Sequence, residues 1–232
     1  MKIEVKNVTK RFKDSVILDD VNLEFVGGKI YGLIGRNGSG KSVLLKMLCA
    51  FYEPSSGEIL YDGENIIKEE KYPPSTRALI EKPAFIPDLT GKQNLLLLAS
   101  IQNIIGEKEI DSTMERLGLV PNDNKKYYKY SLGMKQKLGI AQVLMENPDV
   151  IILDEPFNGL DDDSVNTLRK ILLEEKKNGK VIILATHIKE DIEQLCDIVY
   201  KVDNMKVKLT AKNDLKKEDS PSADCTAAVL FI

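Results

Sequence analysis

The chain has 232 residues, of which 43% are hydrophobic and 30% are charged, so it suits one large domain, or one domain with an added lobe. Thirty-three basic and 36 acidic residues leave a formal charge of −3, which weighs against a dedicated nucleic-acid-binding protein. No apolar run approaches the roughly 20 residues that span a bilayer, and the amino terminus lacks a secretory-type apolar stretch. Cys49, Cys196 and Cys225 are scattered without metal spacing, so we expect idle thiols in a reducing compartment.

The first third of the chain favours strands. Apolar runs bounded by glycine or proline predict strands at residues 3–8, 21–25, 30–35, 57–63 and 77–81. A glycine-rich turn follows the third of these strands, and the apolar pattern after the turn predicts a helix at residues 42–51.

The middle of the chain favours helices instead. Residues 91–118 have helical periodicity without a strand signal, and a further helix is predicted to begin near Ser131. From residue 149 the pattern alternates again, with strands at 150–153, 180–186 and 198–202 and helices at 163–178 and 189–196. Such alternation predicts an α/β fold with a parallel sheet, into which a mostly helical lobe, about residues 83–148, is inserted.

A phosphate-binding loop is the clearest motif. The stretch GRNGSGKS, from Gly35 to Ser42, fits the pattern G-x-x-x-x-G-K-[ST] and lies between an apolar strand and an apolar helix. Its backbone N–H groups would cradle phosphate oxygens, with Lys41 on the β- and γ-phosphates and the Ser42 hydroxyl on Mg²⁺. The alternative is a glycine-rich turn with an incidental lysine. The nucleotide-binding residues expected here are Gly35, Asn37, Gly38, Ser39, Gly40, Lys41, Ser42 and Val43.

Two adjacent acids follow a buried strand. In VIILDEP, Asp154 and Glu155 stand at the carboxyl end of the strand, the edge of an open α/β sheet where ligands bind. We expect Asp154 to serve Mg²⁺ and Glu155 to polarise the water that attacks the γ-phosphorus. The alternative is a solvated pair of acids at a strand end.

With these motifs the chain resembles the ATP-binding-cassette (ABC) ATPases. The stretch YSLGMKQKLGIAQVLMENPDVIILDEPFNGLD looks like the family's signature motif running into its acidic strand, although Tyr130, Leu132 and Met134 depart from the signature. In the family this helix start faces a γ-phosphate bound on a second cassette, which implies that Ser131 and Gly133 contact nucleotide on a partner copy. Ser131 as a plain helix N-cap is the alternative.

Other positions match the family as well. The resemblance implies that Phe12 stacks on adenine, that Asp161 belongs to a loop communicating across the dimer, and that His187 is a switch on the γ-phosphate. Phe12 as ordinary core and His187 as a structural histidine are the alternatives. Glu81 stands where the family usually has glutamine; its carboxylate can reach Mg²⁺ or the attacking water, but when ionised it cannot donate a hydrogen bond.

The resemblance implies one nucleotide-binding domain at residues 1–210, and a tail at 211–232 whose role it does not address. Residues 1–82 and 149–210 would form the ATPase core of a P-loop NTPase, with an amino-terminal antiparallel β part and the helical lobe inserted. The implied function is an ATP- and Mg²⁺-dependent ATPase that dimerises with a copy or a paralogous cassette and drives a separate membrane permease.

The style of the signature is most like that of exporters of drugs, bacteriocins and lantibiotics, and we expect a cytoplasmic location on the inner face of the membrane. No nucleic-acid partner is expected. The alternatives are a soluble ABC ATPase acting on nucleic acid or the ribosome, and a nucleotide-regulated module that does not hydrolyse ATP. A GTPase or a small-molecule kinase would leave the Ser131 helix unexplained.

Overall fold

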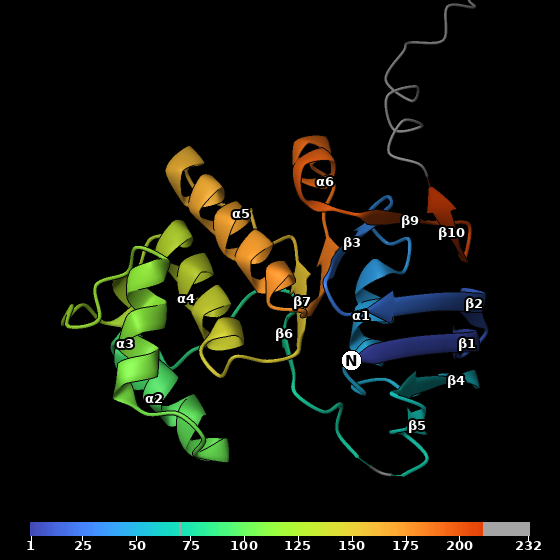
Figure 1. The fold of residues 1–232 in the computed structure, drawn as a ribbon, viewed down its shortest axis with the longest axis horizontal. Coiled ribbons are helices and arrows are strands. Elements are labelled where there is room, and N and C mark those ends of the chain that lie inside the picture. The colour runs from blue at the N-terminus through green and yellow to red at the C-terminus, as the bar shows by residue number, and fades with distance from the viewer. Residues whose placement is uncertain (70, 211–232) are drawn as a thin grey trace, which may run out of the picture.

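The computed structural model describes residues 1–69 and 71–210, and the expectations for Cys225 and the 211–232 tail lie outside these residues. The chain forms a four-stranded antiparallel sheet, a six-stranded, mainly parallel sheet and a group of helices on the far side of the parallel sheet (Figure 1). In the described part of the chain, no helix combines the length and apolar character that crossing a membrane requires.

The antiparallel sheet is built mainly from the amino-terminal strands, in the order β2-β1-β4-β5. β1 (Lys2–Phe12) and β2 (Ser15–Val26) form a hairpin, and β4 (Ser56–Tyr61) pairs with the other edge of β1, followed by the short β5 (Glu64–Asn65). Both hairpin strands are longer than the sequence predicts: β1 continues to Phe12, and β2 begins at Ser15 and includes the buried Leu18.

The second sheet has the order β10-β9-β3-β8-β7-β6. Every pairing in it is parallel except that of β10 with β9. β7 and β8 are buried along almost their whole length, as expected for strands covered on both faces. The strands are β3 (Lys29–Ile34), β6 (Thr76–Leu79), β7 (Val150–Asp154), β8 (Val181–Ala185), β9 (Ile198–Asp203) and β10 (Lys206–Thr210).

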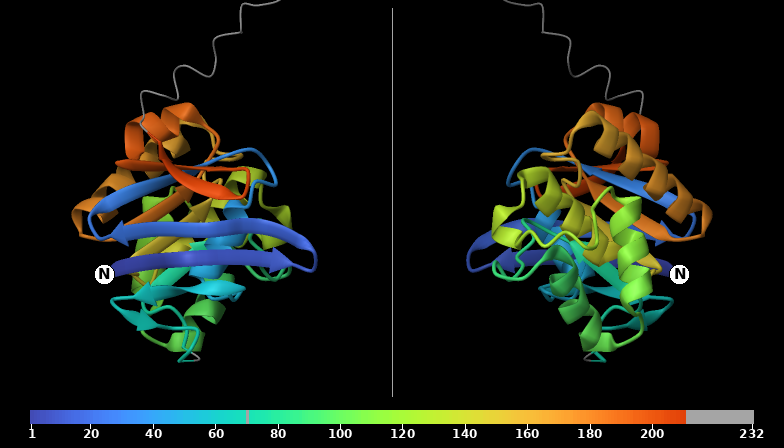
Figure 2. Two further views of the ribbon diagram at one scale, coloured as in Figure 1. Left: turned by 90° about the vertical axis from the view of Figure 1, so that its right-hand side faces the viewer. Right: turned by 90° about the vertical axis from the view of Figure 1, so that its left-hand side faces the viewer.

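The helices fall into three groups. α1 (Lys41–Leu48) follows β3, while α5 (Asp162–Lys177) and α6 (Lys189–Leu195) lie over the parallel sheet. The helices of the middle of the chain gather at one end of the molecule (Figure 1), and they face the viewer in the right-hand view of Figure 2. They are α2 (Gly91–Gln102), α3 (Glu107–Arg116), the 3₁₀ turn η1 (Tyr127–Lys129) and α4 (Leu132–Leu144).

Two hydrophobic clusters share the parallel sheet between them. Ile151 and Leu153 of β7 pack with the lobe helices, α5 and α6, whereas Val150 and Ile152 pack with α1 and the antiparallel sheet. Successive strand residues point to opposite faces, so one apolar run serves both clusters. Cys49 and Cys196 are buried, and neither forms a disulfide within the described residues. α1 is therefore fixed between the two sheets, and this fixes the loop that precedes it.

Candidate nucleotide-binding and catalytic site

The glycine-rich loop joins the end of β3 to the start of α1, the context that the sequence predicts. Gly40 is the residue before the helix and has φ +108°, a conformation that side chains rarely adopt. Gly38 has φ +78°, and a Cβ there would meet no atom within 4 Å, so the loop is open on that side. The loop and the start of α1 therefore border open space, at the place where a helix N-terminus can bind an anion.

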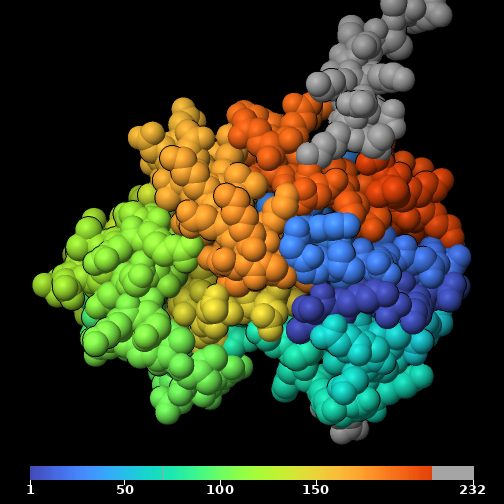
Figure 3. Space-filling model, in the orientation of Figure 1, coloured from blue at the N-terminus to red at the C-terminus, as the bar shows by residue number. Residues whose placement is uncertain are grey.

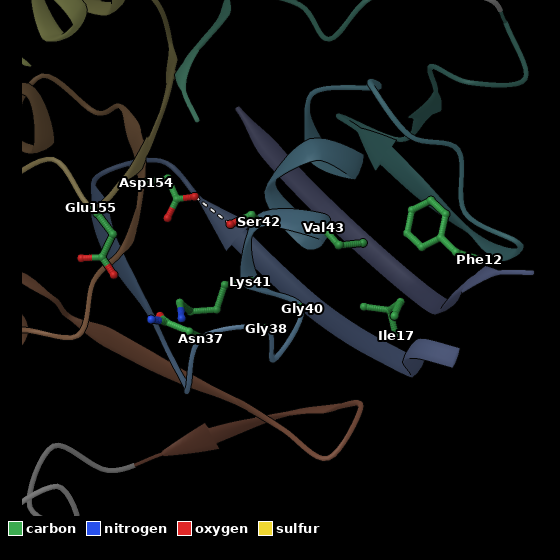
Figure 4. A pocket seen from close by; sticks show the side chains of 10 residues that line it. All are labelled: Phe12, Ile17, Asn37, Gly38, Gly40, Lys41, Ser42, Val43, Asp154 and Glu155. Carbon is green, nitrogen blue, oxygen red and sulfur yellow. Dashed lines mark hydrogen bonds between the residues drawn. The ribbon is translucent and has the colours of Figure 1, made fainter. Parts of the chain in front are cut away.

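A cavity of about 360 Å³ lies over this loop (Figure 4). The glycine-rich loop, the hairpin β1–β2 and the end of β7 all contribute to its walls. Its lining residues are Phe12, Ile17, Asn37, Gly38, Gly40, Lys41, Ser42, Val43, Asp154 and Glu155.

Lys41 and Ser39 fit a phosphate ligand. The Lys41 side chain is 7% exposed, and its Nζ donates to the backbone carbonyls of Gly35 at 2.7 Å and of Arg36 at 3.3 Å. The Ser39 hydroxyl is buried and has no hydrogen-bond partner among the described residues. Among the described residues, the buried Lys41 ammonium thus has backbone carbonyls as its hydrogen-bond partners, and the Ser39 hydroxyl has none. A bound polyphosphate would satisfy both groups.

Ser42 and Asp154 meet across the cavity, where the Ser42 hydroxyl donates to Asp154 Oδ2 at 2.8 Å. Burial, together with the neighbouring carboxylates of Glu155 and Glu81, raises the pKa of Asp154 above its ordinary range, against the opposing hydrogen bond from Ser42. A desolvated carboxylate beside a hydroxyl supplies the hard oxygen ligands that Mg²⁺ prefers, with water completing its shell. The two residues expected to hold Mg²⁺ therefore fit the ion.

Glu155 and His187 form a second contact at this edge of the sheet. The Nδ1 atom of His187 lies 2.9 Å from each carboxylate oxygen of Glu155. Glu155 has φ +49°, so the chain turns sharply where β7 ends. Gln136 of α4 supports this turn, because its amide donates to the carbonyls of Pro156 at 3.0 Å and Glu155 at 3.4 Å. His187 does not line the cavity itself; it reaches the site through Glu155.

Phe12 lies at the rim of the cavity, and its side chain is 40% exposed. The Tyr52 ring packs edge-on against it with centroids 5.3 Å apart, and the Lys10 ammonium lies 4.7 Å from the Phe12 centroid. An exposed aromatic face that is held from behind is typical of a platform for a planar ring and unlike a core residue.

The remaining predicted site residues lie elsewhere in the chain's own structure. Ser131, Gly133 and Asp161 do not line the cavity. Ser131 is exposed and caps α4, accepting a hydrogen bond from the Met134 N–H at 3.2 Å, and Asp161 caps α5 in the same way. The capping interpretation of Ser131 is thus confirmed.

Glu81 also lies outside the cavity lining. Its carboxylate is 65% exposed and accepts a hydrogen bond from the Lys46 ammonium of α1 at 2.5 Å, rather than contacting Ser42 or Asp154. Glu81 has φ +66° and stands just beyond β6, where the chain leaves the sheet towards the lobe.

Four residues at or around the site are absent from the sequence-based prediction: Ile17, Lys46, Tyr52 and Gln136. Ile17 reaches the cavity only because the β1–β2 hairpin folds β2 beside Phe12. Gln136 lies in the predicted signature helix, five residues after Ser131. This place in the motif is the one feature of the sequence that could have indicated its role.

Comparison with known proteins agrees with this geometry. The family model described as "ABC transporter" matches residues 18–158. An uncharacterised ABC transporter ATP-binding protein, YybJ of Bacillus subtilis (strain 168), is 40% identical over 93% of this chain and 99% of its own length. The bacitracin transport ATP-binding protein BcrA of Enterococcus faecalis is 37% identical over 85% of this chain and 65% of its own length.

The lantibiotic transport ATP-binding protein SrtF of Streptococcus pyogenes is 33% identical over 85% of both chains. A solved structure titled as the ATP-binding subunit of an ABC transporter superposes with a TM-score of 0.84 at 28% identity, covering 94% of this chain and 93% of that one. These relatives confirm the expected likeness to the exporters of drugs, bacteriocins and lantibiotics. The chain therefore belongs to the ABC transporter ATP-binding family, whose members hydrolyse ATP, and it is an ATPase of that family.

Proposed function

We propose that the chain binds ATP–Mg²⁺ in the cavity above the glycine-rich loop, pairs head to tail with a second cassette, and hydrolyses ATP to drive a separate membrane permease. The observation that carries the proposal is the meeting of Lys41, Ser42, Asp154 and Glu155 at one cavity, with Phe12 at its rim. Residues 1–82 and 149–210 would act as the ATPase core and residues 83–148 as the lobe that moves with the permease.

Each residue has a defined task in this mechanism. Phe12 stacks on the adenine, and the loop N–H groups together with Lys41 hold the phosphates. Ser42 and Asp154 would hold Mg²⁺, which neutralises charge on the transferred phosphoryl group. Glu155 accepts a proton from the attacking water, and His187 orients the Glu155 carboxylate through the 2.9 Å contact with Nδ1.

The position of the signature helix supports the head-to-tail dimer. The amino terminus of α4 carries an exposed Ser131 and, from its helix dipole, partial positive charge, yet neither Ser131 nor Gly133 lines the chain's own cavity. A phosphate bound to a second copy is the ligand that would use this helix start. Two copies arranged in this way would complete two nucleotide sites, and a paralogous cassette in place of one copy would do the same.

A largely apolar surface where the lobe meets the core supports a permease partner. Phe51, Tyr72 and Gln102 line a recess there of about 340 Å³, between the green and cyan segments of Figure 3. Ile101 and Ile104 of the neighbouring lobe surface are 77% and 60% exposed. Exposed apolar groups gathered around one recess mark an interaction site. The names of the bacitracin and lantibiotic relatives favour an antimicrobial peptide or drug as cargo, and a place for this chain on the cytoplasmic face of the membrane.

Nucleotide binding by Lys41→Ala tests the cavity assignment. We expect ATP affinity to fall by at least about tenfold, because a charge-assisted contact with the phosphates is worth about 1.5–3 kcal/mol. Isothermal titration calorimetry measures the change, and Lys170→Ala, which removes an exposed lysine from the outside of α5, is the matched control. Unchanged ATP affinity in Lys41→Ala would refute the cavity assignment.

A further inference from the structure

Glu81 and Lys46 form an ion pair just outside the nucleotide cavity. The Lys46 Nζ atom lies 2.5 Å from Glu81 Oε1, and the side chains of Lys46 and Glu81 are 22% and 65% exposed. Glu81 comes from the connection after β6 and Lys46 from α1, 35 positions earlier in the chain. The pair therefore joins two segments of the chain. One is the connection that leads into the lobe, and the other is α1, which begins at the phosphate-binding loop.

The position of Lys46 is fixed by its surroundings. Ser42 and Lys46 are four residues apart on α1, so they project from the same face of the helix. The Lys46 ammonium also lies 5.7 Å from the centroid of the Tyr52 ring, which packs edge-on against Phe12. The Lys46 ammonium thus contacts both an aromatic ring and the Glu81 carboxylate.

The charges around the cavity explain why such a pair is useful. Asp154 and Glu155 already place two carboxylates in the cavity wall. The Glu81 carboxylate lies beside the same site, since it pairs with Lys46, which stands one helical turn after Ser42 on the same face of α1. A third unpaired carboxylate beside the site would repel the phosphates of ATP, because like charges at short range outside bulk water repel one another strongly.

We propose that Lys46 is the dedicated counter-ion of Glu81: it holds this carboxylate away from the cavity and cancels its repulsion of bound phosphates. This inference rests on the proposed function, in that ATP is the ligand of the cavity. Lys46 is then a positioning residue, and it affects nucleotide affinity only through Glu81.

A double-mutant cycle on ATP affinity tests the pair. The variants are Lys46→Met, Glu81→Gln and the double variant, with Lys46→Arg as the control that keeps the charge. ATP binding is titrated calorimetrically in EDTA, so that the readout depends on neither Mg²⁺ nor turnover. Thermal unfolding of each variant establishes that it is folded at the titration temperature.

We expect Lys46→Met to weaken ATP binding about three- to fivefold when Glu81 is present, the size that a partly exposed ion pair allows. In the Glu81→Gln background the same substitution should have no effect, and Lys46→Arg should bind ATP as the wild type does. Equal weakening in both backgrounds, or no weakening in either, would overturn the inference while leaving the nucleotide site intact. Absence of ATP binding by the wild-type chain would instead refute the proposed function, and this inference with it.

Discussion

At the scale of single residues, the proposed hydrolysis depends on the Glu155 carboxylate. It lines the cavity, contacts His187 at 2.9 Å and follows the turn that Gln136 supports. Glu155→Gln preserves the shape of the side chain but cannot accept a proton from water. We expect ATP turnover to fall at least about 100-fold, the usual value of a general base, while ATP affinity in EDTA stays within twofold. Phosphate release at the wild-type rate would refute the role of Glu155.

The contact of His187 with Glu155 leads to a second prediction at this scale. Because Nδ1 makes the contact, an asparagine amide nitrogen, which sits near the place of Nδ1, can reproduce it. We therefore expect His187→Ala to lower turnover about tenfold or more and His187→Asn to retain more activity than His187→Ala. Single-turnover hydrolysis measures both variants. Equal activity of the two would show that His187 does not act through Nδ1.

Site residues within one continuous motif were predictable from sequence, because the local backbone brings them together. The loop from Gly35 to Ser42 and the adjacent acids at the end of β7 are of this kind. Ile17 and Lys46 were not predictable, since each reaches the site through contacts with residues far away in the chain. Glu81 was recognised by its position, but its partner Lys46 was visible only in three dimensions.

At the scale of elements, a small ion cluster joins the lobe to the core. Glu175 of α5 accepts hydrogen bonds from Arg116, at the end of α3, at 3.0 Å, and from Lys180, before β8, at 2.6 Å. Lys180 also donates to Asn147 at 2.6 Å. Burial by itself raises the pKa of Glu175, but the hydrogen bonds from Lys180 and Arg116 outweigh it and leave the pKa below its ordinary value.

Glu175→Gln should therefore destabilise the protein in a pH-dependent way. At pH 7 we expect a loss of about 3 kcal/mol in the free energy of unfolding, because the buried Lys180 ammonium loses its charged partner and keeps the neutral Asn147 amide. A carboxylate whose pKa is lowered by folding stabilises the folded state at pH values above its unfolded-state pKa. This stabilisation is lost as the pH falls through the folded-state pKa. The difference between wild type and variant should thus be smaller at pH 4 than at pH 7 in urea unfolding.

Glu174→Gln is the matched control, since Glu174 is exposed and pairs only with Arg116 among the described residues. We expect it to change stability by less than about 0.5 kcal/mol at either pH. A pH-independent loss for Glu175→Gln, or an equal loss for both variants, would contradict the assignment of the buried pair.

Elements with a strong apolar pattern were predictable, and elements with a weak one were not. β7 and β8 are continuous apolar runs, and both lie where the sequence predicts them. β10 (Lys206–Thr210) was missed, because it is an edge strand with two lysines whose pairing with β9 has no local signal. Within the predicted helical stretch at 91–118, α2 ends at Gln102, because Asn103 adopts φ +54°, and α3 begins at Glu107.

At the scale of the whole molecule, the start of α4 lies outside the chain's own nucleotide cavity. Ser131→Asp keeps a good helix cap but places a negative charge where the γ-phosphate of a second copy would lie. Ser131→Asn keeps the cap without the charge and is the matched control. We expect the aspartate substitution, made in the Glu155→Gln chain, to abolish ATP-driven dimerisation and leave ATP affinity of the single chain within twofold. Sedimentation velocity measures the dimer, and equal dimerisation of both variants would contradict a phosphate facing Ser131.

The central claim is that two copies enclose ATP between the cavity of one and the α4 start of the other. Light scattering of the Glu155→Gln chain with saturating ATP tests it most directly. We predict a mass equal to twice the 26.0 kDa of a single chain with ATP, and the single-chain mass when ATP is left out. A single-chain mass in both conditions, with ATP shown to be bound, would contradict the claim.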